Sequence, residues 1–135
     1  MEAKLKHLEF VQQTITRMAA NSFFLKGWSI TLISALAVLA QKDTNTNFWV
    51  IALVPATTFW GLDGYFLRQE KLFRKLYDSV RIKSEAEIDF SMDVSPFQNQ
   101  VGSWLRLVFS STLVAFHLTI LLAVLLIAWF VNQGK

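Results

Sequence analysis

The sequence contains no cysteine, which excludes disulfide bonds, thiol nucleophiles and cysteine-ligated metal sites in this chain. Histidine is nearly as scarce, because only His7 and His117 occur and they lie far apart in the sequence. No nucleophile elbow, phosphate-binding glycine loop, metal-ligand cluster or pair of catalytic carboxylates is recognisable. We therefore predict a protein that is not an enzyme and that uses no cofactor and no metal ion.

Charge is also sparse, since 17% of the 135 residues are charged whereas 53% are hydrophobic. The apolar residues form three long runs, at residues 23–40, 48–67 and 107–131. A helix rises about 1.5 Å per residue, so each run has about the length needed to cross a hydrocarbon core of roughly 30 Å. The sequence predicts an all-α fold: one membrane domain over residues 1–135, with three transmembrane helices.

Residues 1–22 are charged and carry an apolar stripe at helical spacing, unlike the hydrophobic region of a signal peptide. We expect an amphipathic N-terminal helix that lies on the membrane surface or packs against the polar part of the protein. Asn21 and Ser22 are candidates for capping the separate helix of the first span.

Positive charge is unevenly placed around the three runs. It gathers before the first run and between the second and third, whereas Lys42 and Lys135 stand alone on the other side. By the positive-inside rule the N-terminus is cytoplasmic and the C-terminus is periplasmic or extracellular. The tryptophans agree with two aromatic belts, at the outer ends of the runs (Trp49, Trp129) and near the inner ends (Trp28, Trp104).

The second run continues into charged sequence without a helix breaker, with apolar residues on one face and charged residues on the other. The charged face includes Glu70, Arg74, Lys75 and Arg81. Ser95-Pro96-Phe97-Gln98 is typical of a helix start before the third run. We expect residues 68–106 to form an antiparallel cytoplasmic hairpin, which gives the second and third helices about 35 residues each, roughly 50 Å.

Within this hairpin, residues 83–95 form a linker in which Ile88, Phe90, Met92 and Val94 alternate with polar residues. The alternation predicts an extended segment with one packed face. Two interpretations remain open: an ordered cap on the hairpin, or an edge strand that reaches a neighbouring subunit. Asp89, Ser91 and Asp93 are spaced like half a calcium loop, but the required glycine and distal glutamate are missing, so no calcium site is expected.

Three ionisable residues lie inside the apolar runs: Lys26, Asp63 and His117. Their similar distances from the outer ends of the runs predict one common depth, roughly 23 Å from the outer surface. Ionisable groups are costly in a bilayer and tend to mark function. We predict that Asp63 pairs with Lys26 or His117, within or between subunits. In the alternative, Lys26 reaches the inner headgroups and Asp63 lies in a wet interface.

The third helix is expected to carry a polar stripe, which would be an interhelical hydrogen-bond seam or a pore lining: Asn99, Ser103, Arg106, Ser110 and His117. A single three-helix chain hides few such faces from lipid, which predicts a homo-oligomer. Small residues predict close helix packing on the first span (Gly27, Thr31, Ala35) and on the second (Gly61, Gly64).

Two segments, NSFFLKGW (21–28) and FWGLDGYFLRQEKLFRKLYD (59–78), resemble small bacterial inner-membrane proteins of the RipA-type octameric family. These are similar in outline to the membrane accessory protein of type VI-B CRISPR systems. The resemblance implies a ring-like homo-oligomer in the inner membrane, with a pore that serves antiphage defence or envelope physiology. It assigns no catalytic residue.

The expected function is that of a non-enzymatic oligomer that forms or gates a pore, with Asp63, Arg106 and His117 tuning its polar path. Its partners would be membrane lipid and further copies of itself. The alternative is a scaffold or accessory subunit whose cytoplasmic hairpin binds a partner protein. The basic residues of the hairpin either only set the topology or also bind anionic lipid or nucleic acid. Acidic residues in the same segment argue against binding of a polyanion, and so against nucleic acid as a partner: Glu85, Glu87, Asp89 and Asp93.

Overall fold

The computed structural model describes residues 1–42 and 47–134, apart from the side chain of Phe48. Residues 43–46, between the first two predicted spans, and Lys135 lie outside the described residues. The described chain contains helices and no strand: α1 (Glu2–Lys42), α2 (Phe48–Ile82), α3 (Trp104–Val108) and α4 (Ser111–Gln133), with short 3₁₀ helices at Glu85–Glu87 and Ser95–Gln100. Helices α1, α2 and α4 are long and apolar enough to cross a membrane. The all-α class and the three candidate spans are thus confirmed.

The first helix differs from the prediction, because α1 is continuous over 41 residues. The predicted amphipathic helix 1–22 and the span 23–40 are parts of this one helix, and Asn21 and Ser22 do not cap a second one. The neighbouring sequence explains the continuity, since Ala19, Ala20 and Leu25 are good helix formers and no proline or glycine interrupts them.

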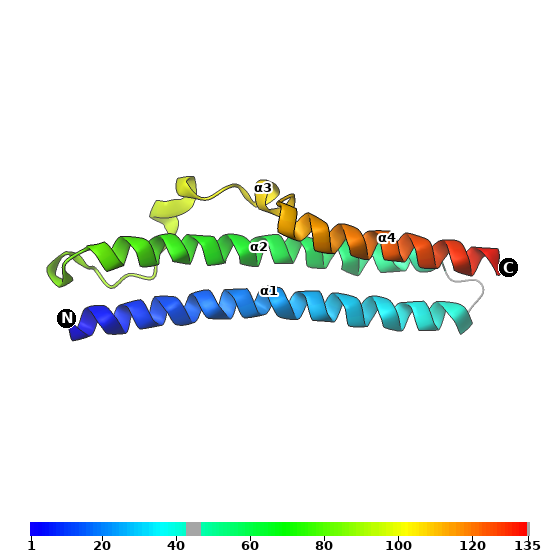
Figure 1. The fold of residues 1–135 in the computed structure, drawn as a ribbon, viewed down its shortest axis with the longest axis horizontal. Helices are drawn as coiled ribbons and strands as arrows, with labels where there is room; N and C mark the ends of the chain where they lie inside the picture. The colour runs from blue at the N-terminus through cyan, green and yellow to red at the C-terminus, as the bar shows by residue number, and fades with distance from the viewer. Residues whose placement is uncertain (43–46, 135) are drawn as a thin grey trace.

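Helices α1 and α2 run antiparallel, side by side along almost their whole length (Figure 1). Two apolar clusters join them. One lies toward the C-terminal end of α1 and includes α4: Ile33, Ala40, Ala52, Ala56, Val124 and Ala128. The other lies toward the N-terminal end of α1 and includes part of the segment after α2: Val11, Ile15, Leu76, Val80 and Ile88. We call the end of the protein that contains this second cluster the stalk; it is formed by residues 2–21, 65–82 and 83–103.

The end of α2 in the stalk is fixed by α1. The Lys4 ammonium donates hydrogen bonds to the carbonyl oxygens of Arg81 (3.0 Å) and Lys83 (2.6 Å). These carbonyls belong to the last turn of α2 and to its C-cap, where a cation also meets the negative end of the helix dipole. In the stalk, α2 is therefore paired with α1, and not with the third predicted helix as expected.

The predicted second arm of the hairpin, one helix from Ser95 to residue 131, is wrong. The chain returns along α2 in pieces, and two serines in extended conformation begin new helices: Ser103 before α3 and Ser110 before α4. The Ser103 hydroxyl accepts a hydrogen bond from the Arg106 N–H at 3.3 Å, as an N-cap does. Ser95 and Pro96 begin a 3₁₀ helix rather than an α-helix, with Val94 at its N-cap.

The linker 83–95 is an ordered loop and not a strand. Ile88 is buried, but Phe90 and Met92 are exposed, and Phe90 has a left-handed φ of 56°. Each polar side chain of the alternating pattern accepts a hydrogen bond from the backbone N–H two residues ahead. Asp89 accepts from Ser91, Ser91 from Asp93 and Asp93 from Ser95, all at 3.0 Å. The alternation thus produces a series of side-chain-stabilised turns, in which the polar residues replace a strand ladder.

Candidate functional site

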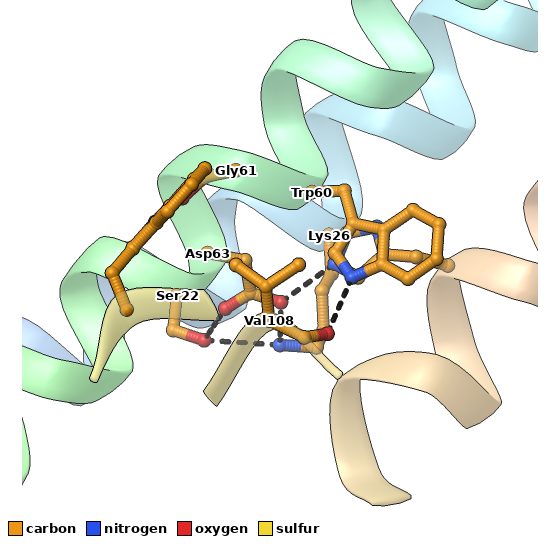
Figure 2. A network of polar contacts seen from close by, with 8 residues as sticks. Ser22, Lys26, Trp60, Gly61, Asp63 and Val108 are labelled. Atoms are coloured by element: carbon orange, nitrogen blue, oxygen red, sulfur yellow. Dashed lines mark hydrogen bonds and ion pairs between the residues drawn. The ribbon is translucent and has the colours of Figure 1, made fainter. Parts of the chain in front are cut away.

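A buried ionic cluster lies where the three long helices meet, in the apolar part of the protein (Figure 2). Its centre is Asp63 of α2, whose side chain is fully buried. The Lys26 ammonium of α1 donates to Asp63 Oδ2 at 2.6 Å, and His117 Nε2 of α4 contacts the same oxygen at 2.8 Å. The Ser22 hydroxyl donates to Oδ1 and accepts from Lys26 at 2.9 Å. We call these four residues the Asp63 cluster.

The cluster is positioned by helix geometry. Ser22 and Lys26 are four residues apart on α1, so both point toward α2 from one face. The Lys26 ammonium also lies 5.7 Å from the centre of the Phe116 ring of α4, a distance that allows a cation–π contact. Lys26 is therefore turned into the protein, toward Asp63. It does not extend away from the helices, as the alternative with the inner headgroups required.

His117 is enclosed by aromatic rings. Its ring is stacked on Trp60 at 5.7 Å with an angle of 8° between the planes, and it meets Phe116 edge-on at 5.0 Å. An ionised carboxylate only accepts hydrogen bonds, so His117 donates from Nε2. Its other nitrogen, Nδ1, is buried and has no hydrogen-bond partner in residues 1–42 and 47–134. The imidazole is thus held by one polar bond and by its ring contacts.

Two indole groups close the cluster on the α3 side. Trp60 Nε1 donates to the carbonyl oxygen of Val108 at 2.8 Å, and Trp104 Nε1 donates to that of Gly61 at 2.9 Å. The bonds run in opposite directions between α2 and α3, and each satisfies a carbonyl group. They fix α3 directly beside the turn of α2 that carries Asp63.

This close approach depends on the two glycines of α2 for which a packing role was predicted. A methyl group at Gly64 would overlap the Val108 side chain, and one at Gly61 would lie 3.3 Å from the Trp104 ring. Gly61 and Gly64 therefore serve helix packing as predicted, with α3 as the neighbour.

The predicted polar stripe of the third helix is not formed, because its five residues no longer share one helix. Asn99 lies in a 3₁₀ helix, Ser103 caps α3, Arg106 is exposed on α3 and Ser110 precedes α4. Only His117 reaches the Asp63 cluster. The Ser110 hydroxyl is buried and finds no hydrogen-bond partner in the described part of the chain.

The other predicted packing residues face outward. A methyl group at Gly27 would meet no atom of the described residues within 4 Å, and Thr31 and Ala35 are exposed, so this seam is not packed against the described part of the chain. The Thr31 hydroxyl is satisfied locally by the Gly27 carbonyl oxygen at 3.0 Å. Large apolar side chains beside the seam are exposed as well: Phe23 (73%), Phe24 (60%) and Trp28 (65%).

The predicted charged face lies on the stalk. Glu70 and Arg74 form an ion pair at 2.9 Å, and Arg81 pairs with Asp78 at 3.3 Å. Lys75 is exposed and has no ion-pair partner among the residues that the structure describes.

Sequence reasoning missed two features of this site. Ser22 was assigned to a helix cap, although its spacing of four residues from Lys26 could have placed both on one face. The paired indole bonds of Trp60 and Trp104 could not be found, because they depend on the break before α3.

The fold and the cluster together define an all-helical protein with three candidate membrane spans and a polar centre shared by all three. No protein-family model, curated protein or solved structure matches this chain. In residues 1–42 and 47–134, no group of three or more histidine, cysteine, aspartate or glutamate side chains is placed to hold a metal ion.

Proposed function

We propose that this protein is a non-enzymatic, homo-oligomeric membrane protein that forms or gates a pore, and that the Asp63 cluster holds its closed state. The observation that carries the proposal is the position of Asp63, which is fully buried among apolar helices and bound by residues from both other spans. Apolar packing joins helices at a lower desolvation cost than a buried ion pair does. An ionic centre at this place therefore favours a switching role.

Unsatisfied polar atoms near the cluster support two states. Among the residues that the structure describes, the Ser29 hydroxyl, the Ser110 hydroxyl and His117 Nδ1 are buried without a hydrogen-bond partner. His117 belongs to the cluster, Ser29 follows Lys26 by three residues, and Ser110 precedes His117 by seven, about two helical turns. Buried polar groups are normally paired, so these atoms would gain hydrogen bonds in an arrangement that admits water. Opening would separate α1 and α4 from Asp63 and hydrate the space between them.

Self-association would use the outward face of α1. The Gly27, Thr31 and Ala35 seam is open and allows a second helix to approach closely. On the resemblance noted in the sequence, we propose a ring in the bacterial inner membrane that acts in antiphage defence. The positive-inside rule supports a cytoplasmic N-terminus and a periplasmic or extracellular C-terminus.

Ion flux through liposomes tests the proposal. Asp63→Asn keeps the shape of the side chain but weakens its bonds to Lys26 and His117, so K⁺ efflux should rise above that of the wild type. Glu70→Gln is the matched control, since it makes the same chemical change at an ion-paired carboxylate of the stalk. Efflux equal to that of empty liposomes for both the wild type and Asp63→Asn, at verified incorporation, counts against a pore.

A second candidate is a scaffold or accessory subunit whose stalk binds a cytoplasmic protein. The favouring observation is that the stalk has its own apolar core and so presents Arg74, Lys75 and Arg81 on a fixed helix face. This function predicts that Lys75→Glu with Arg81→Glu abolishes activity in cells without changing ion flux. The pore function predicts that Asp63→Asn changes both.

A further inference from the structure

A basic groove of about 450 Å³ runs between α2 and the segment that leads into α3. Four cationic side chains line it: Lys71, Arg74, Lys75 and Arg106. Asp78 is the one carboxylate that lines it. The groove therefore has four cationic side chains for one carboxylate, whereas the whole chain has 13 lysines and arginines for 10 aspartates and glutamates.

Most of this positive charge is uncommitted. Within the described chain, no side-chain hydrogen bond or ion pair engages Lys71, Lys75 or Arg106. Asp78 is paired with Arg81 at 3.3 Å, so it does not neutralise these cations. Three cationic side chains thus line one groove without a hydrogen-bond or ion-pair partner among the described residues.

The acidic residues of the linker do not neutralise the groove either, because none of them lines it. They are engaged locally. The Glu87 carboxylate accepts from the Ser84 N–H and hydroxyl, both at 2.9 Å, and the Asp93 carboxylate accepts from the Ser95 N–H and hydroxyl. The acidic residues of the linker therefore leave this groove free to bind an anion.

The groove lies where the apolar surface of the helices ends. Lys71 follows Asp63 by about 12 Å along α2. Arg106 is on α3, whose Trp104 indole bonds to Gly61 beside the cluster. Leu105 and Phe109, one residue before and three residues after Arg106 in the chain, are exposed by 59% and 65%. Uncommitted cations next to exposed apolar side chains match the two parts of a phospholipid.

We propose that this groove binds an anionic phospholipid, with its phosphate against Lys71, Lys75 and Arg106 and its acyl chains along Leu105 and Phe109. Basic pockets beside membrane helices on the cytoplasmic side bind such headgroups, and arginine can hold a phosphate through two parallel hydrogen bonds. The inference rests on the three helices crossing a bilayer and is independent of whether the protein conducts ions.

Native mass spectrometry of the purified protein in mild detergent, titrated with phosphatidylglycerol and with phosphatidylcholine, tests the site. Phosphatidylglycerol should bind more tightly, and Lys71→Gln with Arg106→Gln should weaken it about 10-fold or more. The matched control is Lys6→Gln with Lys83→Gln, which makes the same change in net charge at exposed lysines outside the groove and should retain affinity within about 2-fold. If the double variant does not fold, Lys75→Gln alone should still weaken binding.

Three outcomes would overturn the proposal. The first is equal binding of the two lipids, and the second is equal loss of affinity in the groove variant and the control. The third is displacement of the lipid by millimolar inorganic phosphate, which would assign the groove to a soluble phosphate ligand. Each outcome is independent of ion flux, so a failure here is distinct from a failure of the pore.

Discussion

Lys26 of α1 and His117 of α4 bind the same atom, Oδ2 of Asp63, at 2.6 and 2.8 Å. One carboxylate oxygen therefore joins three helices that are far apart in the sequence. Loss of the His117 bond detaches α4 from the carboxylate, whereas α1 also keeps the hydrogen bond from Ser22; loss of the carboxylate removes all of these bonds. This dependence makes the Asp63 cluster a point where a small change has a large structural effect.

Asp63→Asn should destabilise the fold, because it leaves the Lys26 ammonium without its counter-charge. Removing one partner of a buried ion pair costs roughly 3 kcal/mol. Chemical denaturation in detergent micelles, followed by tryptophan fluorescence, measures the loss. Adding Lys26→Met to Asp63→Asn should recover part of it, since no unpaired charge then remains; a double variant less stable than Asp63→Asn alone contradicts this explanation.

Gly64→Ala should lower stability by about 1–3 kcal/mol, because the added methyl overlaps Val108. Val108→Ala should partly rescue it by removing the overlapped group. Gly27→Ala is the control, since a methyl there meets no atom within 4 Å. It should leave stability unchanged or raise it by up to about 1 kcal/mol through helix propensity. Thermal unfolding in detergent distinguishes these results, and equal losses at both glycines would argue against the close approach of α3.

Self-association should depend on the outward seam of α1. Gly27→Leu with Thr31→Leu fills the seam, so the oligomer fraction measured by cross-linking in liposomes should fall. Ala115→Leu with Thr119→Leu also introduces two leucines four residues apart, at exposed residues of α4, and should leave the fraction unchanged. An unchanged oligomer fraction in the seam variant would remove α1 from the interface.

The linker of the stalk should titrate at acidic pH. Hydrogen bonds from the Ser84 backbone and hydroxyl hold the pKa of Glu87 below its usual 4.5, and those from the Ser95 hydroxyl and backbone hold the pKa of Asp93 below 3.8. Because the folded-state pKa values are lowered, this stabilisation is complete above the usual values and is lost as the pH falls through the lowered ones.

The backbone amide NMR signals of Ser84 and Ser95 report this titration, since each amide donates to the carboxylate concerned. Both should shift only below the usual pKa values. Glu87→Gln should abolish the shift of Ser84, and Asp93→Asn that of Ser95. Titration of both amides at or above 4.5 and 3.8 would contradict the assigned hydrogen bonds.

Burial and pairing in the apolar part could be predicted because few polar residues interrupt long apolar runs. Lys26, Asp63 and His117 had few partners to choose from besides each other, so a common depth was enough to bring them together. The roles of Gly61 and Gly64 followed from the same logic of close packing beside a polar group.

The third helix was predicted wrongly because its breaks are weakly encoded. Gly102-Ser103 and Ser110 are tolerated inside helices. The break is favoured by tertiary hydrogen bonds, which the Trp60 and Trp104 indoles donate to the carbonyl oxygens of Val108 and Gly61, together with the Ser103 cap. The alternating linker was misjudged for a related reason. Period-two polar residues fit a strand, but serine and aspartate at those positions also form successive turns.

Electrical recording across a planar bilayer tests the central claim most directly, because discrete current steps distinguish a pore from general leakage. The wild type should be mostly closed, and Asp63→Asn should show step openings far more often. Glu70→Gln should resemble the wild type. An absence of steps from both the wild type and Asp63→Asn, with the protein shown to be in the bilayer, would contradict the claim that the Asp63 cluster closes a pore.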